Sequence, residues 1–125
     1  MVKALVEEYL SQVKDIDLRI RSLEGELHDV EAEQDVEYAE ELKSRITTDI
    51  AAYKEVKLII REEILSLKDN RLSTLLSEYY VRGRSWEQVA EAIGLKDSKN
   101  VRTALHEKAL KYFAMNFPEK FKCIP

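Results

Sequence analysis

Apolar residues recur every three or four positions along the first half of the chain. One stripe of this kind spans residues 2–30, and its other faces carry Glu, Asp, Lys and Arg. Such spacing is typical of the seam of a coiled-coil-like helix. The stripe consists of Val2, Leu5, Tyr9, Val13, Ile16, Ile20, Leu23, Leu27 and Val30.

The register of this stripe is lost after Val30, and a second stripe begins on another face. Its members are Leu42, Ile46, Ile50, Tyr53, Val56, Ile60, Ile64 and Leu67. The break predicts a turn near residues 33–36, with Asp35 as an N-cap. Two arrangements satisfy the pattern: an antiparallel hairpin of two helices, or one bent helix that buries its seams against a second chain. In either case Ile59 and Leu65, which lie off the stripe, indicate further contacts.

A shorter apolar pattern follows over residues 71–82, after the capping candidates Asp69 and Asn70. Gly83 can end this helix, because glycine readily adopts positive φ. After Ser85, which can cap a helix with Gln88 in the spacing of a capping box, Trp86 begins another short helix. We expect Trp86 to pack against Tyr79 or Tyr80.

Residues 83–113 read GRSWEQVAEAIGLKDSKNVRTALHEKALKYF and predict two helices joined by a tight turn. Gly94 ends the first, and Asp97 or Ser98 caps the second. Helix, glycine-containing turn and helix form the helix-turn-helix pattern, whose second helix enters the DNA major groove. An ideal α-helical repeat of about 100° per residue places six residues on the core side of the second helix. They are Val101, Ala104, Leu105, Lys108, Ala109 and Tyr112.

The opposite side of that helix carries the candidate DNA contacts. Arginine and lysine reach phosphates and guanine edges, and threonine, asparagine and histidine reach either. These candidates are Lys99, Asn100, Arg102, Thr103 and His106, together with Arg84 before the first helix. A solvated polar face is the alternative for the same residues. Leu110 and Phe113 also point away from the predicted core side, so they require cover from the C-terminal tail, the hairpin or a second subunit.

The two halves of the chain differ in net charge. Residues 1–70 carry 10 Lys/Arg and 18 Asp/Glu, a net charge of −8, whereas residues 71–125 carry 10 and 6, a net charge of +4. The basic half suits a polyanion and the acidic half suits a protein partner. We therefore interpret residues 1–70 as an arm for dimerisation or protein contact, residues 71–115 as the helix-turn-helix domain and residues 116–125 as a tail.

Composition excludes several function classes. The chain of 125 residues has 45% hydrophobic and 35% charged residues, with only three Gly and two Pro, which favours one all-α unit. The single cysteine, Cys123, forms no internal disulfide, and no stretch resembles a signal peptide or a membrane helix, so we expect a cytoplasmic protein. The two histidines have no metal-ligand spacing, and no nucleophile motif or phosphate loop is present. We expect no cofactor and no enzyme.

The segments SWEQVAEAIG and VRTALHEKALKYF resemble the helix-turn-helix of sigma factor region 4. With Tyr79, Tyr80 and Gly83 before it, the stretch is similar to small sigma-region-4-like regulators of bacteriophages and prophages. The resemblance implies a late-gene type of transcriptional regulator that binds double-stranded DNA and contacts RNA polymerase. The GLKDSKN turn is longer than the usual sigma turn, and no promoter-melting region is present. A protein-binding module of the same shape, without DNA contact, is the alternative, and a homodimer is expected in the first case.

Overall fold

The computed structural model describes residues 2–121, and Cys123 and the last part of the expected tail lie outside the described residues. Within residues 2–121 all regular elements are helical, as the sequence predicts. They are α1 (Val2–Asp29), η1 (Val30–Ala32), α2 (Val36–Leu65), α3 (Asn70–Leu76), η2 (Ser77–Val81), α4 (Trp86–Ala92), α5 (Ser98–Asn100), η3 (Val101–Leu105), α6 (His106–Asn116) and α7 (Pro118–Phe121). The short element η1 is a 3₁₀-helix, and η2 and η3 are π-helical turns.

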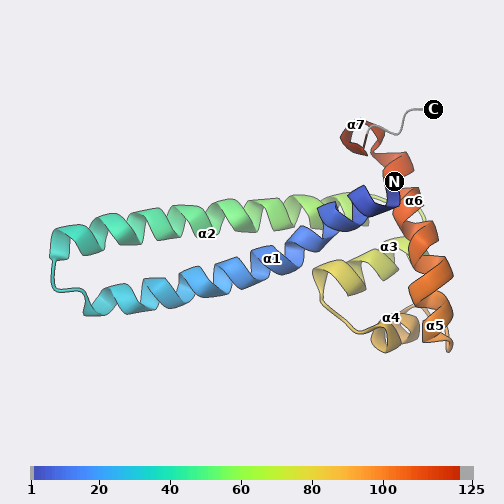
Figure 1. Ribbon diagram of the computed structural model, residues 1–125, viewed down its shortest axis with the longest axis horizontal. Coiled ribbons are helices and arrows are strands. Elements are labelled where there is room, and N and C mark those ends of the chain that lie inside the picture. Colours follow the sequence, from blue (N-terminus) through green and yellow to red (C-terminus); the bar gives the residue numbers. More distant parts are fainter. Residues whose placement is uncertain (1, 122–125) are drawn as a thin grey trace.

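The helices α1 and α2 lie side by side and extend far from the rest of the molecule (Figure 1). We call residues 2–65 the arm and residues 70–121 the body. Contacts between the two helices occur in reverse order along the chain, because the hydroxyl of Tyr9 donates to Glu63 and Lys57 donates to Asp17 at 2.8 Å. The turn falls where the stripe breaks, and the Asp35 side chain accepts from the backbone N–H of Tyr38 at 3.1 Å. The prediction of Asp35 as N-cap is confirmed.

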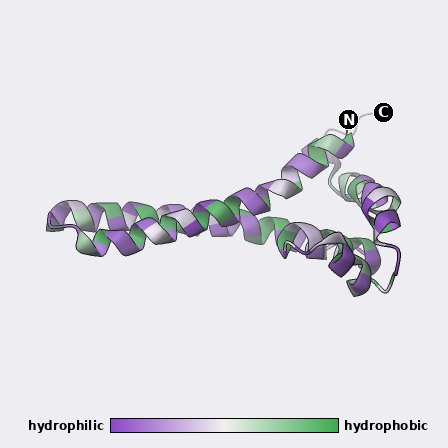
Figure 2. Ribbon diagram, turned by 60° about the horizontal axis from the view of Figure 1, so that its bottom comes forward, coloured by the Kyte–Doolittle hydropathy of each residue, from purple (hydrophilic) through white to green (hydrophobic). Residues whose placement is uncertain are grey.

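Two separate apolar clusters hold the molecule together. The distal cluster lies within the arm and consists of Ile16, Ile20, Val30, Ile46 and Ile50. The proximal cluster joins the base of the arm to the body and includes Leu10, Ile64, Leu75 and Phe113, all fully buried. Figure 2 shows apolar turns alternating with polar ones along the arm, as expected of helices that bury one face.

At the N-terminal end of α1 the predicted stripe names the wrong buried residues. Leu5 is 49% exposed, whereas Val6 and Leu10, which lie off the stripe, are completely buried. The reason is a change of partner along α1. Its distal residues Ile16 and Ile20 cluster with residues of η1 and α2, whereas Val6 and Leu10 cluster with residues of η2 and α6 as well, so another face of the helix is covered there.

The segment from Phe117 to Phe121 returns to the base of the arm. Helix α6 ends at Asn116, before Pro118, which begins the short helix α7. The ring of Phe121 lies 5.6 Å from that of Tyr9, centroid to centroid, and Phe117 lies 4.7 Å from Phe113. The expectation that Phe117 and Phe121 fold back onto the protein is confirmed.

Candidate nucleic-acid interface

A capping box and a left-handed glycine position the first helix of the candidate interface. The backbone N–H of Gln88 donates to Ser85 Oγ at 3.2 Å, and the backbone N–H of Ser85 donates to Gln88 Oε1 at 3.0 Å. Gly94 has φ of 78° beyond the end of α4, in a conformation that disfavours other residues. Val89 and Ala90 lie on the buried face of this helix. These local signals were predicted from the sequence and are confirmed.

The second helix begins at a cap of the same kind. The Asp97 side chain accepts from the backbone N–H of Asn100 at 3.1 Å, so Asp97 and not Ser98 is the N-cap. Four residues after Asp97, Val101 is completely buried. Because α5, η3 and α6 follow each other without a break, they form one rod that α4 contacts at its start.

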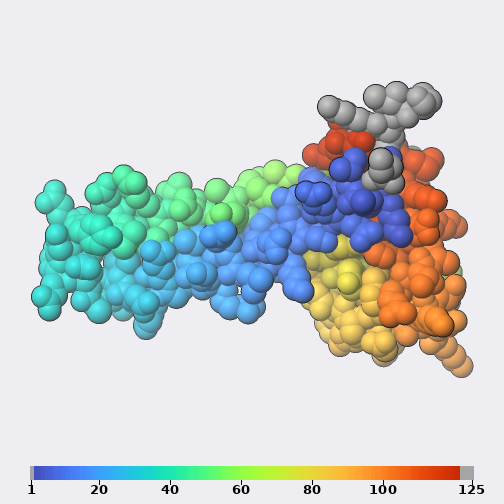
Figure 3. Space-filling model, in the orientation of Figure 1, coloured from blue at the N-terminus to red at the C-terminus, as the bar shows by residue number. Residues whose placement is uncertain are grey.

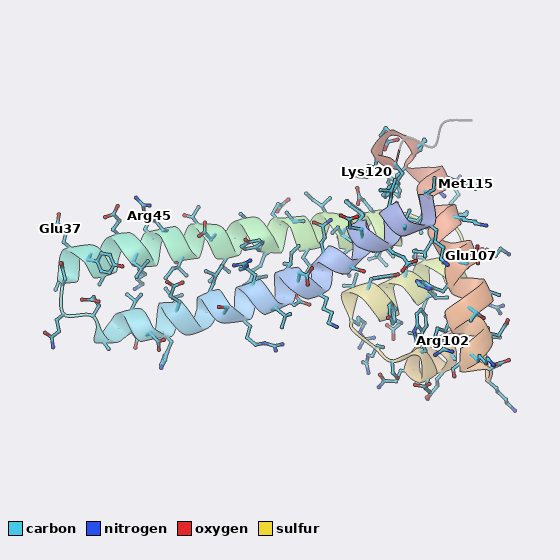
Figure 4. All side chains as sticks on the ribbon, viewed as in Figure 1. Glu37, Arg45, Arg102, Glu107, Met115 and Lys120 are labelled. Carbon is cyan, nitrogen blue, oxygen red and sulfur yellow. The ribbon has the colours of Figure 1, made fainter. Side chains whose placement is uncertain are left out.

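Four of the six candidate residues lie exposed on the first turns of this rod. They are Lys99, Asn100, Arg102 and Thr103. Figure 4 labels Arg102, which lies at the end of the body farthest from the tail. The hydroxyl of Thr103 donates to the carbonyl of Lys99 at 2.9 Å, which leaves its lone pairs free to accept. Neither Lys99 nor Arg102 forms an ion pair within residues 2–121.

A π-turn in the middle of the rod changes which residues face the core. In η3, Val101–Leu105, the backbone accommodates one residue more than an α-helical turn. All later residues are thereby shifted by one position, or about 100°. Leu110 and Phe113 are fully buried, while Ala104 and Lys108 are exposed. The predicted core side is therefore wrong at Ala104 and Lys108. The cover expected for Phe113 comes from the tail and from α1, because its ring lies 4.7 Å from that of Phe117 and 6.2 Å from that of Tyr9, centroid to centroid.

The same shift corrects the placement of His106. Its ring turns inward and is only partly exposed, and its Nε2 lies 2.6 Å from the hydroxyl of Tyr80. Burial lowers the pKa of His106 from its ordinary value of 6.5. An imidazole that is held in this way cannot also reach a base edge or a phosphate, so the structure excludes His106 from the exposed face.

His106 belongs to an aromatic cluster that sequence reasoning found only in part. The rings of Tyr79 and Trp86 stack at 3.9 Å between centroids, which confirms the expected packing of Trp86. His106 lies 4.8 Å from Trp86 and 5.8 Å from both Tyr79 and Tyr80. The sequence predicted that Trp86 packs against Tyr79 or Tyr80. It did not predict the π-turn that brings His106 into the same cluster, because that turn has no sequence signal that we recognise.

The structure does not group Arg84 with the other candidates. Arg84 lines a cleft between α1 and the segment from Tyr79 to Arg84, and none of the residues that line this cleft comes from α5 or η3. The candidate interface therefore consists of Lys99, Asn100, Arg102 and Thr103 on one helix start.

Residues 2–121 show neither a metal-binding cluster nor a membrane-spanning helix. Residues 2–121 contain no group of three or more His, Cys, Asp or Glu side chains that could hold a metal ion. None of the helices there has the length and apolar character needed to cross a membrane.

Comparison with known proteins adds no assignment. No family model matches the sequence, and neither the curated proteins nor the solved structures contain a match to this chain.

Proposed function

We propose that this protein is a DNA-binding transcriptional regulator in which the α5–η3–α6 rod is the recognition helix of a helix-turn-helix. In this proposal α3, α4 and the rod form the trihelical domain, and the arm is an antiparallel hairpin that contacts protein. The observation that carries the proposal is the start of the rod. Lys99, Arg102 and Thr103 are exposed there while Val101 is buried, so a basic polar face protrudes from a fixed helix.

Charge and local geometry support this reading. Residues 71–125 have a net charge of +4 and residues 1–70 have a net charge of −8. Duplex DNA is therefore attracted to the body and repelled by the arm. A capped helix start is also a rigid support for side chains that read a groove. The resemblance to sigma region 4 points to promoter-type DNA and to contact with RNA polymerase, and both remain part of the proposal.

Duplex binding at several salt concentrations tests the proposal. Arg102→Ala is expected to weaken binding by about 1–3 kcal/mol, and Lys99→Ala is expected to reduce the slope of log K against log salt by about 1. Arg45→Ala is the matched control, since Arg45 is an exposed arginine near the far end of the arm (Figure 4). Fluorescence anisotropy of a labelled duplex, chosen by selection from random sequences, measures both quantities.

Two results would contradict DNA binding through this face. One is the absence of duplex binding at low salt, and the other is an equal loss of affinity in Arg45→Ala and Arg102→Ala. Selected sequences with two-fold symmetry would support a dimer, because a symmetric protein reads a symmetric site.

A second candidate function is a protein-binding module without DNA contact. The outer face of α2 favours it, because Leu58, Ile59 and Leu65 are between 44% and 48% exposed. With Phe117, the first two of these line a shallow groove of about 370 Å³. Loss of partner binding in Ile59→Ser, together with no effect of Arg102→Ala in any assay, would favour this function over the first.

A further inference from the structure

A cleft at the junction of arm and body brings together cations that are far apart in the sequence. It has a volume of about 390 Å³ and is lined by Ser11, Lys14 and Asp17 of α1 and by residues 79–84. Figure 3 shows this part of α1 lying directly against the segment that contains η2. The volume lies within the range of small-molecule sites.

The charges around the cleft are unbalanced. Lys14, Arg82 and Arg84 face one carboxylate, Asp17, among the lining residues. Asp17 is neutralised by Lys57 at 2.8 Å, and Arg82 is paired with Glu78 at 2.9 Å. Within residues 2–121, Lys14 and Arg84 have no ion-pair partner. Two cations thus remain available at the base of an arm that is otherwise strongly acidic.

Backbone hydrogen bonds hold the segment that carries Arg82 and Arg84. The N–H of Arg82 donates to the carbonyl of Ser77 at 3.0 Å, and the N–H of Arg84 donates to that of Glu78 at 2.9 Å. Gly83 between them has φ of 67°. This hydrogen-bonded turn fixes the direction in which Arg84 leaves the chain, and the side chain is partly buried. A partly buried side chain loses less freedom on binding an anion than a fully solvated one does.

We propose that this cleft binds a phosphate group, with Lys14 and Arg84 as its principal ligands and the hydroxyl of Ser11 as a further donor. A guanidinium fork combined with an ammonium suits the several oxygens and the double charge of a phosphate better than the single charge of a carboxylate. The phosphate could come from a free phosphate compound or from a nucleic-acid backbone, which present the same chemistry. The site does not depend on DNA binding by Lys99 and Arg102.

The protein contains its own reporter for this site. Trp86 is the only tryptophan, and it stacks on Tyr79, which lines the cleft. Titration with inorganic pyrophosphate at constant ionic strength is expected to change the Trp86 emission to saturation. Lys14→Gln and Arg84→Gln are each expected to weaken binding about tenfold or more, because each removes a charge-assisted hydrogen bond. Lys54→Gln, which changes an exposed lysine of the arm outside the cleft, is expected to bind as the wild type does.

Far-UV circular dichroism and the urea midpoint of each variant show that it is folded before it is titrated. An emission change that does not saturate would overturn the proposal. So would binding that is unaffected by both Lys14→Gln and Arg84→Gln, or that is weakened equally by Lys54→Gln.

A second titration, with the protein saturated by duplex DNA, identifies the source of the phosphate. If the duplex abolishes the pyrophosphate response, the backbone occupies the cleft, and if the response persists, the ligand is a free phosphate compound. Both results are meaningful only after pyrophosphate has been shown to bind in the absence of DNA. Failure of this site is therefore distinguishable from failure of the recognition helix, which is measured with Arg102→Ala.

Discussion

At the scale of single residues, His106 is the clearest case of a side chain whose role depends on its surroundings. It faces Tyr79 and Tyr80 of η2 and Trp86 of α4, and the charges of Glu7 and Lys3 on α1 also act on it. Desolvation by burial is the largest influence on its pKa and favours the neutral ring. His106 therefore links the α5–η3–α6 rod to three other elements, η2, α4 and α1.

This burial makes the stability of the protein depend on pH. Because the pKa of His106 is lower in the folded protein than its ordinary 6.5, the unfolded chain binds more protons below that pH. The contribution of His106 to stability is full above pH 6.5 and declines as the pH falls toward the folded-state pKa. We expect His106→Gln to reduce this decline, as measured by urea unfolding at about pH 7.5 and about pH 5.5.

His28→Gln is the control for this prediction, since His28 lies exposed on the arm. If both substitutions, or neither, changed the difference between the two pH values, the role assigned to His106 would be wrong.

At the scale of elements, the π-turn η3 decides the orientation of the rod. One extra residue between Val101 and Leu105 rotates His106, Leu110 and Phe113 onto the core side and moves Lys108 to solvent. The exposed face at the helix start and the buried face at its end therefore coexist in one helix. A regular α-helix with the same residues would have to expose Leu110 or bury Lys108.

Deletion of Ala104 tests this account of the rod. Ala104 is exposed, and its removal lets a regular α-helix bring Val101, His106 and Phe113 to the same side. We expect the free energy of unfolding to stay within about 1 kcal/mol of the wild type, because no buried side chain is lost. Urea denaturation followed by circular dichroism measures the change.

Deletion of Lys108 is the matched control, since Lys108 is equally exposed but lies in a regular part of α6. This deletion would rotate Leu110 and Phe113 out of the core and is expected to cost about 2–5 kcal/mol or to unfold the body. Equal losses from the two deletions would show that the π-turn does not absorb the extra residue.

At the scale of the whole molecule, the two apolar clusters divide the protein into regions of different stability. The proximal cluster joins α1 and α2 to the body, whereas the distal cluster is confined to the arm. The far end of the arm is supported by few buried side chains, and such regions open by local unfolding.

Hydrogen exchange of the backbone amides tests this division. We expect residues 24–45 to exchange about tenfold or more faster than residues 60–76, because only the latter adjoin the proximal cluster. Ile46→Ala should accelerate exchange in the arm alone, and Leu10→Ala should accelerate it throughout the chain. Leu10→Ala should also lower the free energy of unfolding by about 2–5 kcal/mol. Uniform protection along the arm in the wild type would contradict two separate clusters.

Local signals in the sequence determined the helices and their ends. Asp35, Ser85 and Asp97 cap helices through their own backbone neighbours, and Gly83 and Gly94 need positive φ, so each acts within a few residues. The second stripe likewise predicted the buried positions Ile46, Ile50, Ile60 and Ile64, because its period reports one face of one helix.

Only the tertiary structure decided which faces meet and which cations converge. Val6 and Leu10 are buried because α1 changes partner, and His106 is buried because a π-turn alters the register of the rod. Lys14 and Arg84 are far apart in the sequence but line the same cleft, because the base of the arm packs on η2. A repeat of fixed period carries no information about such changes of partner or register, since their free energy comes from contacts between distant residues.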